Sequence, residues 1–536
     1  MPAAIRSNHL YYGDNLTIMR TMPPASVDLL YLDPPFNSQR SYNLIYQRLT
    51  GQPVPEQEEA FCDAWVMDTE KEEMVRTMPI VFRDYGADDG LIQFWKAWID
   101  ALRHTQPRLL AYLVYMSYRL FEMKRVLKPT GCIYLHCDPT ASHYIKIIMD
   151  GIFGHQNFRN EVIWKRTNAK GLAFTRMASN HDVILTYTKG DKFTWNPQYV
   201  AHDPSYIEKF YRYVDPETGR RYRLDNLANP NRDRPNLTYE FLGVTRVWRW
   251  TKERMQATYD QGLVVQNKPG SVPAFKRYLD EQEGTPIDDV WTDIRPIQSQ
   301  AKERLGYPTQ KPLGLLQRII QASSNEGDVV FDPFCGCGTA VYAAHLLGRK
   351  WVGCDIAILS VKLIRDVLLK RYGLKEGEHY QISGVPRSVE AAQVLFDDDP
   401  YQFQHWAVEL SGGFASVKRS GDRGIDGRIH FDTKDGLQNM VLSVKGGSNL
   451  TPAFMRELRG VLERENTSVM GGLICLHEPT KGMRVEEARG GLWDYLGQPY
   501  QRLQIRTVGE LLAGKAFNTP SRVQTLDWTK QIPLPF

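Results

Sequence analysis

The 536-residue sequence has little of several features that define special classes of protein. Its 7 cysteines are odd in number and have no repeated spacing, which argues against a disulfide framework and indicates a reducing compartment. No run approaches the roughly 18 apolar residues that a membrane helix needs, and the first residues lack the apolar core of a signal peptide. We therefore expect a cytoplasmic protein with no membrane partner.

Charge of one sign is also scarce, since 66 Lys and Arg face 62 Asp and Glu, for a net charge of +4. This balance excludes a histone-like polycation but leaves open a local concentration of positive charge. Residues 161–260 carry 17 Lys and Arg against 12 Asp and Glu, together with 16 aromatic residues. The positive excess is therefore regional, and the many Pro and Asn residues there predict a loop-rich insertion.

Sequence repeats and long low-complexity tracts are absent, so the organisation has to be read from the order of secondary-structure elements. Apolar patterns predict buried strands at residues 27–32, 132–137, 328–331 and 351–354. Helical patterns occupy residues 115–127, 142–153, 339–347 and 360–372, and residues 128–131 read as a turn. Alternating strands and helices predict an α/β fold with a mostly parallel sheet.

A glycine-containing turn, FDPFCGCGT at residues 331–339, stands between a predicted strand and a predicted helix. Glycines let the backbone approach a ligand, and free amides at a helix start point toward it. Asp355 ends the next strand, where a carboxylate can hold ribose hydroxyls. The pattern predicts a nucleoside-containing cofactor, although a plain tight turn explains a lone Gly-x-Gly about as well. A nicotinamide cofactor fits less well, because Val341 stands where that fingerprint has its third glycine.

A second loop follows the strand at residues 27–32, where two prolines stop both strand and helix. Asp33 accepts hydrogen bonds when ionised, and its backbone carbonyl is a second acceptor, so the pair suits an NH2 group. Accepting both N–H bonds would localise the lone pair of an adenine or cytosine amine for attack on a methyl group. Phe36 would stack on a base flipped out of the duplex. Taken alone, an Asp-Pro-Pro segment is more often only a turn.

Together these segments resemble the S-adenosylmethionine-dependent DNA amino-methyltransferases of the circularly permuted beta class, in which the catalytic loop precedes the cofactor loop. The resemblance rests on YLDPPFN at residues 31–37 and FDPFCGCGT at residues 331–339. It is supported at residues 13–15, 134–138, 160–165 and 307–312, and it runs from about Asn8 to Tyr372.

The resemblance implies a role for each matching residue. Methyl transfer would depend on Asp33, Pro34, Pro35 and Phe36. Cofactor binding would involve Asp14, Lys311, Asp332, Phe334, Gly336, Gly338, Thr339 and Asp355. Aspartate at the first catalytic position is usual for N6-adenine enzymes and serine for N4-cytosine enzymes, whereas Phe36 stands where tyrosine is commoner.

The implied domain order is a Rossmann-like methyltransferase at residues 1–385, with a target-recognition region inserted at residues 165–295. A linker at residues 386–399 leads to a smaller α/β domain at residues 400–514, and residues 515–536 form an irregular tail. The smaller domain resembles the Mrr-like restriction-endonuclease fold, in which Asp426 and Lys445 would hold a divalent metal, with Asp426 as the ligand. It departs from that family at Ser443, where Glu or Gln is usual, and at Gln404, where Glu is usual.

The sequence thus predicts a site-specific methyltransferase that modifies N6 of a flipped-out adenine in double-stranded DNA, within a restriction-modification system. An N4-cytosine enzyme is one alternative. Another is a bifunctional methyltransferase and Mg²⁺-dependent endonuclease. A third is a C-terminal domain that only binds DNA or a partner. The resemblance also implies a homodimer and a restriction or translocase subunit as partner.

Overall fold

The computed structural model describes residues 8–35, 67–87, 89–168, 177–298, 301, 303–305, 309–370, 372–416, 424–434, 436–465 and 468–520. The chain divides into two compact units, one made of residues 1–196 and 289–536 and the other of residues 197–288. Among the described residues, no helix is long and apolar enough to cross a membrane.

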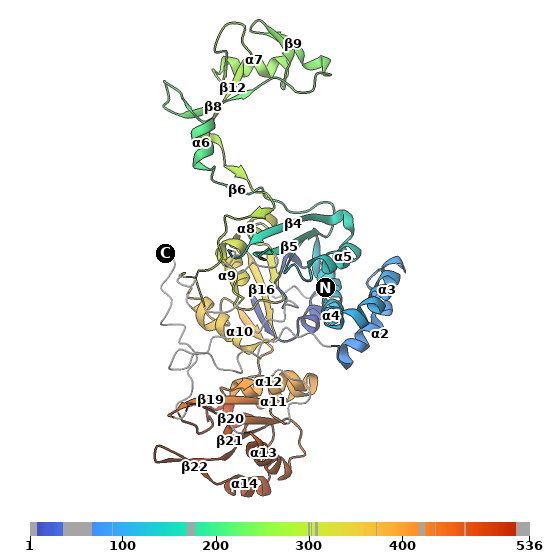
Figure 1. The fold of residues 1–536 in the computed structure, drawn as a ribbon, viewed down its shortest axis with the longest axis vertical. Coiled ribbons are helices and arrows are strands. Elements are labelled where there is room, and N and C mark those ends of the chain that lie inside the picture. Colours follow the sequence, from blue (N-terminus) through green and yellow to red (C-terminus); the bar gives the residue numbers. More distant parts are fainter. Residues whose placement is uncertain are drawn as a thin grey trace. The chain divides into compact units, whose positions relative to one another are not determined.

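A large mixed sheet forms the centre of the first unit (Figure 1). Six of its strand pairs are parallel, and β5 is antiparallel to both β3 and β4, so the predicted mostly parallel sheet is confirmed for the described strands. The strand order is β14 (Val290–Trp291), β4 (Phe158–Lys165), β5 (His181–Thr188), β3 (Leu127–Cys137), β2 (Val27–Leu32), β15 (Val329–Asp332), β16 (Lys350–Asp355), β1 (His9–Tyr12) and β17 (Gln381–Ser383).

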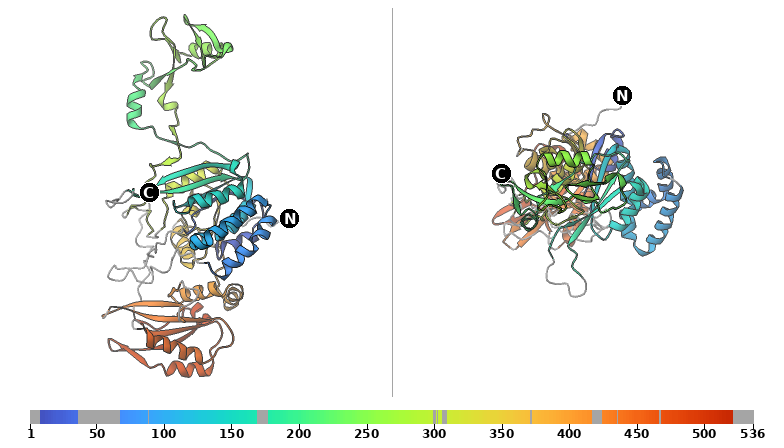
Figure 2. Two further views of the ribbon diagram at one scale, coloured as in Figure 1. Left: turned by 45° about the vertical axis from the view of Figure 1, so that its right-hand side comes forward. Right: turned by 90° about the horizontal axis from the view of Figure 1, so that it is seen from above.

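Helices cover both faces of this sheet. One face packs against α4 and α5, with alternate strand residues such as Leu30, Leu135 and Leu185 in a shared apolar core. Figure 2 brings this helical layer to the front in its left view. The other face is covered by α8 and α9, and Tyr134 of β3 hydrogen-bonds Ser323 of α8 at 2.7 Å. The helices are α1 (Asn15–Thr21), α2 (Thr69–Asp84), α3 (Asp89–Thr105), α4 (Pro107–Val126), α5 (Ser142–Phe153), α8 (Leu313–Ser323), α9 (Thr339–Leu346) and α10 (Ile358–Leu363), followed by a π-helical turn at Ile364–Leu369.

The predicted strand at residues 27–32 and the predicted helix at residues 142–153 are confirmed residue for residue. The predicted turn at residues 128–131 is wrong, because β3 begins at Leu127 and runs through it. The pairing of β3 with β2 is irregular at this point: Val27 pairs with Leu127, but Leu29 pairs with Cys132. The Pro-Thr-Gly segment therefore forms an irregular part of β3, and the chain does not reverse its direction there.

The second unit, residues 197–288, is shorter than the insertion expected at residues 165–295. Residues 227–275 of this unit share a small core around Trp248, Met255 and Phe241. The unit contains β6 (Tyr199–Val200), α6 (Pro204–Phe210), β7 (Tyr213–Val214), β8 (Arg221–Asn226), β9 (Thr238–Phe241), β10 (Val244–Val247), α7 (Lys252–Asp260), β11 (Val264–Val265), β12 (Ala274–Tyr278) and β13 (Thr285–Pro286). It carries 14 Lys and Arg against 13 Asp and Glu, so part of the regional positive excess lies outside the unit.

The C-terminal part of the first unit has its own sheet, in the order β18 (Phe414–Ala415), β19 (Gly427–Thr433), β20 (Gly436–Lys445), β21 (Ser468–Cys475) and β24 (Leu503–Thr507). The predicted linker at residues 386–399 contains a helix, α11 (Val389–Asp398), which Ser388 caps. Other elements here are α12 (Pro400–Leu410), α13 (Ala453–Arg464), α14 (Lys481–Ala488), α15 (Val508–Leu512) and the hairpin of β22 (Leu492–Tyr495) and β23 (Gln498–Gln501). Residues 515–520 of the predicted irregular tail form neither helix nor strand, and the rest of the tail lies outside the described residues.

Candidate active site

Four adjacent parallel strands end at one edge of the large sheet, and each end delivers a carboxylate. Leu30 of β2 pairs with Phe331 of β15, so Asp33 and Asp332 follow neighbouring strand ends. Asp332 pairs with Gly353 of β16, and Asp355 pairs with Tyr12 of β1. Residues 12–33 and residues 332–355 thus meet at the carboxyl edge of the sheet, although about 300 positions separate them. This edge is where α/β proteins place ligands.

The predicted cofactor turn is held tightly between β15 and α9. Its Cys335 amide donates to the Cys354 carbonyl at 3.0 Å, and the Gly338 amide donates to the Cys335 carbonyl at 2.7 Å. Gly336 and Gly338 have φ values of 48° and 82°, in the left-handed region that glycine adopts without strain. Thr339 begins α9, so the turn ends at a helix N-terminus as the sequence predicts.

Asp355 closes this turn from the neighbouring strand. One carboxylate oxygen accepts the Gly336 amide at 2.8 Å, and the other accepts the Ala357 amide at 2.9 Å. Burial raises the pKa of Asp355 from 3.8 to about 6. The Ser360 side chain and the Ile356 amide also hydrogen-bond this carboxylate and lower its pKa, so ribose hydroxyls would share its oxygens with these donors.

Asp332 is more deeply placed, with only 4% of its surface exposed. Its side chain accepts the Phe334 amide at 3.0 Å. Burial raises the pKa of Asp332 well above 3.8, and the neighbouring carboxylates of Asp33 and Asp355 raise it further. Where they are ionised, the carboxylates of this edge concentrate negative charge and favour a cationic ligand, and the raised pKa values of Asp332 and Asp355 move that ionisation to higher pH.

The carboxylate of Asp14, a predicted cofactor residue, forms hydrogen bonds and an ion pair within the protein. Its carboxylate caps α1 by accepting the amides of Leu16 at 2.9 Å and Thr17 at 3.1 Å. It also pairs with Arg119 of α4. The next residue, Asn15, donates to the Pro333 carbonyl at 2.8 Å, so this cap braces the cofactor turn.

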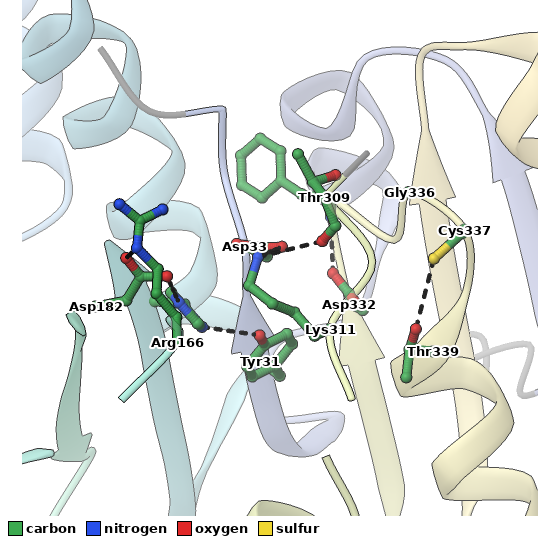
Figure 3. A network of polar contacts seen from close by, with 12 residues as sticks. Tyr31, Asp33, Arg166, Asp182, Thr309, Lys311, Asp332, Gly336, Cys337 and Thr339 are labelled. Carbon is green, nitrogen blue, oxygen red and sulfur yellow. Dashed lines mark hydrogen bonds and ion pairs between the residues drawn. The ribbon is translucent and has the colours of Figure 1, made fainter. Parts of the chain in front are cut away.

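Asp33 ends β2 and forms an ion pair with Lys311, which precedes α8 (Figure 3). Lys311 also lies 3.4 Å from the Thr309 carbonyl. The side chains of Asp33 and Lys311 are 16% and 11% exposed, so both remain accessible at the site. Pro34 is buried and Pro35 is exposed, whereas the predicted stacking residue Phe36 lies outside the described residues.

A buried polar chain that the sequence analysis missed lies beside Asp33. The Tyr31 hydroxyl lies 3.2 Å from His136 Nδ1, and His136 Nε2 donates to Asp182 at 3.0 Å. Arg166 pairs with the other Asp182 oxygen at 2.9 Å. Burial opposes ionisation of Asp182, but the hydrogen bond from His136 and the cations of Arg166 and Lys311 outweigh it and lower its pKa. A sequence signal existed, since His136 and Asp182 are polar residues within otherwise apolar strands.

The predicted metal pair of the C-terminal part has a different environment. Asp426 accepts hydrogen bonds from the Gln404 amide, from Ser443 Oγ at 3.3 Å and from the Val444 amide at 2.6 Å. The Lys445 ammonium lies 4.8 Å from the centre of the Phe454 ring. Across the described ranges, no three His, Cys, Asp or Glu side chains form a group that could hold a metal. A divalent ion takes several oxygen ligands, so the described residues around Asp426 fit such an ion poorly.

The strand order and the two loops define an α/β fold with a ligand site at the carboxyl edge of the sheet. A family model described as DNA methylase, covering N6 and N4 enzymes, matches residues 27–366. The chain therefore belongs to this DNA methylase family.

Two curated relatives are the Type II methyltransferase M.EcaI of Enterobacter cloacae and the Type III restriction-modification enzyme StyLTI Mod subunit of Salmonella typhimurium. The first is 31% identical over 49% of this chain and 58% of its own length. The second is 25% identical over 74% of this chain and 59% of its own length. The chain thus spans about three fifths of each relative.

Solved structures that the chain matches include the cytosine-N4-specific PvuII DNA methyltransferase, at 12% identity and a TM-score of 0.32 over 70% of this chain and 88% of that one. The complex of M1.HpyAVI with S-adenosylmethionine has 13% identity and a TM-score of 0.30 over 67% of this chain and 97% of that one.

Proposed function

We propose that this chain is a beta-class DNA methyltransferase that transfers a methyl group from S-adenosylmethionine to N6 of an adenine in double-stranded DNA. The observation that carries the proposal is the placement of Asp33 and Asp332 at the ends of neighbouring parallel strands, β2 and β15. The catalytic loop precedes the cofactor loop by about 300 residues in the chain, which is the order of the permuted class. The family match supports methylation in general, and Asp33 favours adenine over cytosine.

The residues of the carboxyl edge divide into two groups in this proposal. S-Adenosylmethionine supplies an electrophilic methyl group on a positively charged sulfur, which the negative potential around Asp332 would attract. Asp355 would accept the ribose hydroxyls, and the positive-φ turn at Gly336 and Gly338 would let the backbone approach the cofactor. Asp33 would accept hydrogen bonds from the target amine, so that the nitrogen lone pair is directed at the methyl group.

We assign DNA recognition to the unit of residues 197–288. In the part of the unit formed by β7, β8 and β12, cations form ion pairs, such as Arg220 with Asp280 and Lys276 with Asp215. The part with the small core around Trp248 instead exposes Arg232 and Arg246, and neither forms an ion pair with another described residue. Such cations suit phosphate contacts, which supply most of the affinity for DNA.

For the C-terminal part we favour a binding module over an active nuclease, because the donors around Asp426 fit a structural role better than a metal site. The StyLTI relative is a subunit of a restriction-modification enzyme. By analogy, we propose a restriction or translocase subunit, and a second copy of this chain, as partners. An endonuclease activity and an N4-cytosine target remain the alternative proposals.

The experiment is to express the chain and its Asp33→Ala variant in cells that lack adenine methylation and to sequence the DNA with detection of modified bases. We expect N6-methyladenine at one recurrent site with the wild-type chain and none with Asp33→Ala. Methylcytosine at that site would favour the N4 alternative, and undiminished methylation by a folded Asp33→Ala variant would overturn the proposed role of Asp33.

A further inference from the structure

Lys311 comes from a segment that is anchored independently of any ligand. The Gln310 side chain accepts the Leu305 amide at 2.6 Å and donates to the Glu303 carbonyl at 2.6 Å. Glu303 in turn accepts the Leu313 amide at 3.0 Å, at the first turn of α8. The backbone on both sides of Lys311 is therefore fixed, which limits where its ammonium can lie.

That ammonium faces carboxylates from three different strands. It pairs with Asp33 at the end of β2. Its charge also acts on Asp332 of β15, where it offsets part of the rise in pKa that burial causes, and on Asp182 of β5, where it adds to the interactions that lower the pKa. Asp33 and Asp332 repel each other when both are ionised, so the ammonium compensates a repulsion that the parallel strands impose.

From this geometry we infer that Lys311 is a positioning residue for methyl transfer, which holds the Asp33 carboxylate oriented toward the target amine. The inference rests on the proposed function, because it assumes that Asp33 receives that amine. It changes the role expected from the sequence, in which Lys311 contacts the cofactor. Lys311 acts through Asp33 and touches none of the reacting atoms.

Other charged and titratable groups act on this pair. They include Asp332 of β15, Asp182 of β5, Tyr31 of β2 and Cys337 of the cofactor turn. Lys311 contacts Asp33 directly. Removing its ammonium should therefore leave the Asp33 carboxylate free to rotate away from the target amine.

The test compares the full-length wild-type chain with Lys311→Met and Lys311→Arg, using DNA that contains the methylated site found by sequencing. Three quantities are measured: kcat at saturating DNA and cofactor, the Kd of S-adenosylmethionine by calorimetry, and the KM of the DNA. The matched control is Lys375→Met. The Lys375 side chain is 74% exposed and forms an ion pair with Glu378, which is also exposed.

We expect Lys311→Met to lower kcat about 100-fold, as misplacement of a reacting group does, while the cofactor Kd changes by less than about twofold. Lys311→Arg should recover at least about tenfold of the lost kcat, because it restores the cation that pairs with Asp33, and Lys375→Met should behave as wild type.

Two results would overturn the inference. A cofactor Kd raised more than about tenfold, with kcat at saturating cofactor unchanged, would make Lys311 a cofactor ligand. A kcat deficit that arginine does not reduce would make its role purely structural. Asp33→Ala, assayed in parallel, separates these failures from failure of the proposed function: an active Asp33→Ala variant contradicts the function itself, whereas an inactive one leaves Lys311 to be judged on its own variants.

Discussion

His136 Nε2 and Asp182 Oδ2 lie 3.0 Å apart between β3 and β5, and neither residue is more than 3% exposed. Because an ionised carboxylate only accepts hydrogen bonds, the histidine must donate from this nitrogen, which leaves Nδ1 facing the Tyr31 hydroxyl. Tyr31 is two residues from Asp33, so the pair anchors the strand that delivers the proposed catalytic carboxylate.

We predict that Asp182→Ala lowers the free energy of unfolding by about 3 kcal/mol at pH 7, because it leaves His136 and Arg166 without their buried partner. Urea denaturation measures this. The folded-state pKa of Asp182 is lowered, so its contribution is present above pH 4 and is lost as the pH falls further. Asp89→Ala, in an exposed pair with Arg83, is the control and should cost less than about 1 kcal/mol. Equal losses in the two variants would contradict a stabilising role for the buried chain.

Cofactor affinity should depend on the ionisation of Asp355. Its folded-state pKa is about 6, and only the ionised form accepts both ribose hydroxyls. Below pH 6 the Kd of S-adenosylmethionine should therefore rise about tenfold per pH unit, while it stays level above pH 7. Calorimetry at several pH values measures this. In Asp355→Asn the affinity should be weak and independent of pH over this range, so a pH dependence that survives the substitution would assign the titration to another group.

The same raised pKa makes a prediction for the protein without ligand. A carboxyl whose pKa rises from 3.8 to about 6 on folding stabilises the fold below pH 4, and this contribution is lost as the pH rises through 6. Asp355→Asn removes that titration, so the variant should gain stability relative to wild type between pH 4 and pH 7. Thermal denaturation over this range measures the difference, and parallel curves for the two proteins would contradict the assigned shift.

DNA affinity should depend on the unpaired cations of residues 197–288 more than on the paired ones. Arg246→Ala should weaken DNA binding and reduce the slope of log affinity against log salt by about 1, as loss of one phosphate contact does. Arg220→Ala should leave that slope unchanged, because Asp280 and Glu281 already occupy its guanidinium. Fluorescence anisotropy at several salt concentrations measures both. A larger slope change for Arg220→Ala would instead assign the DNA contacts to the part of the unit around β8 and β12.

The C-terminal part should be stabilised by Asp426 without cutting DNA. We expect Asp426→Ala to lower the melting temperature, since the Gln404, Ser443 and Val444 donors lose their acceptor. Mg²⁺ should not change the melting temperature of the wild-type chain. Supercoiled unmethylated plasmid with Mg²⁺ should remain uncut, and nicking that Asp426→Ala abolishes would favour the nuclease alternative.

Local sequence chemistry was sufficient to predict the elements that carry the site. The prolines at 34 and 35 end β2 at Leu32, and the glycines of the cofactor turn place Thr339 at the start of α9. It failed at residues 128–131, where a Pro-Thr-Gly segment typical of a turn is held in β3 by pairing with β2. The expectation of a linker also missed α11, although the signal there is local, because Ser388 caps the helix by accepting the Ala391 amide.

The sequence by itself therefore determined the α/β class, the two loops and the identities of Asp33, Asp332 and Asp355, because turn residues and apolar periodicity act over a few positions. Only the tertiary structure decided which of those residues meet. Strand order placed β2 beside β15, although about 300 residues separate them, and it brought Lys311 to Asp33 and His136 to Asp182. The β2–β15 contact depends on parallel pairing and the His136–Asp182 contact on antiparallel pairing of β3 with β5, and pairing between separate segments is a long-range property that no local pattern encodes.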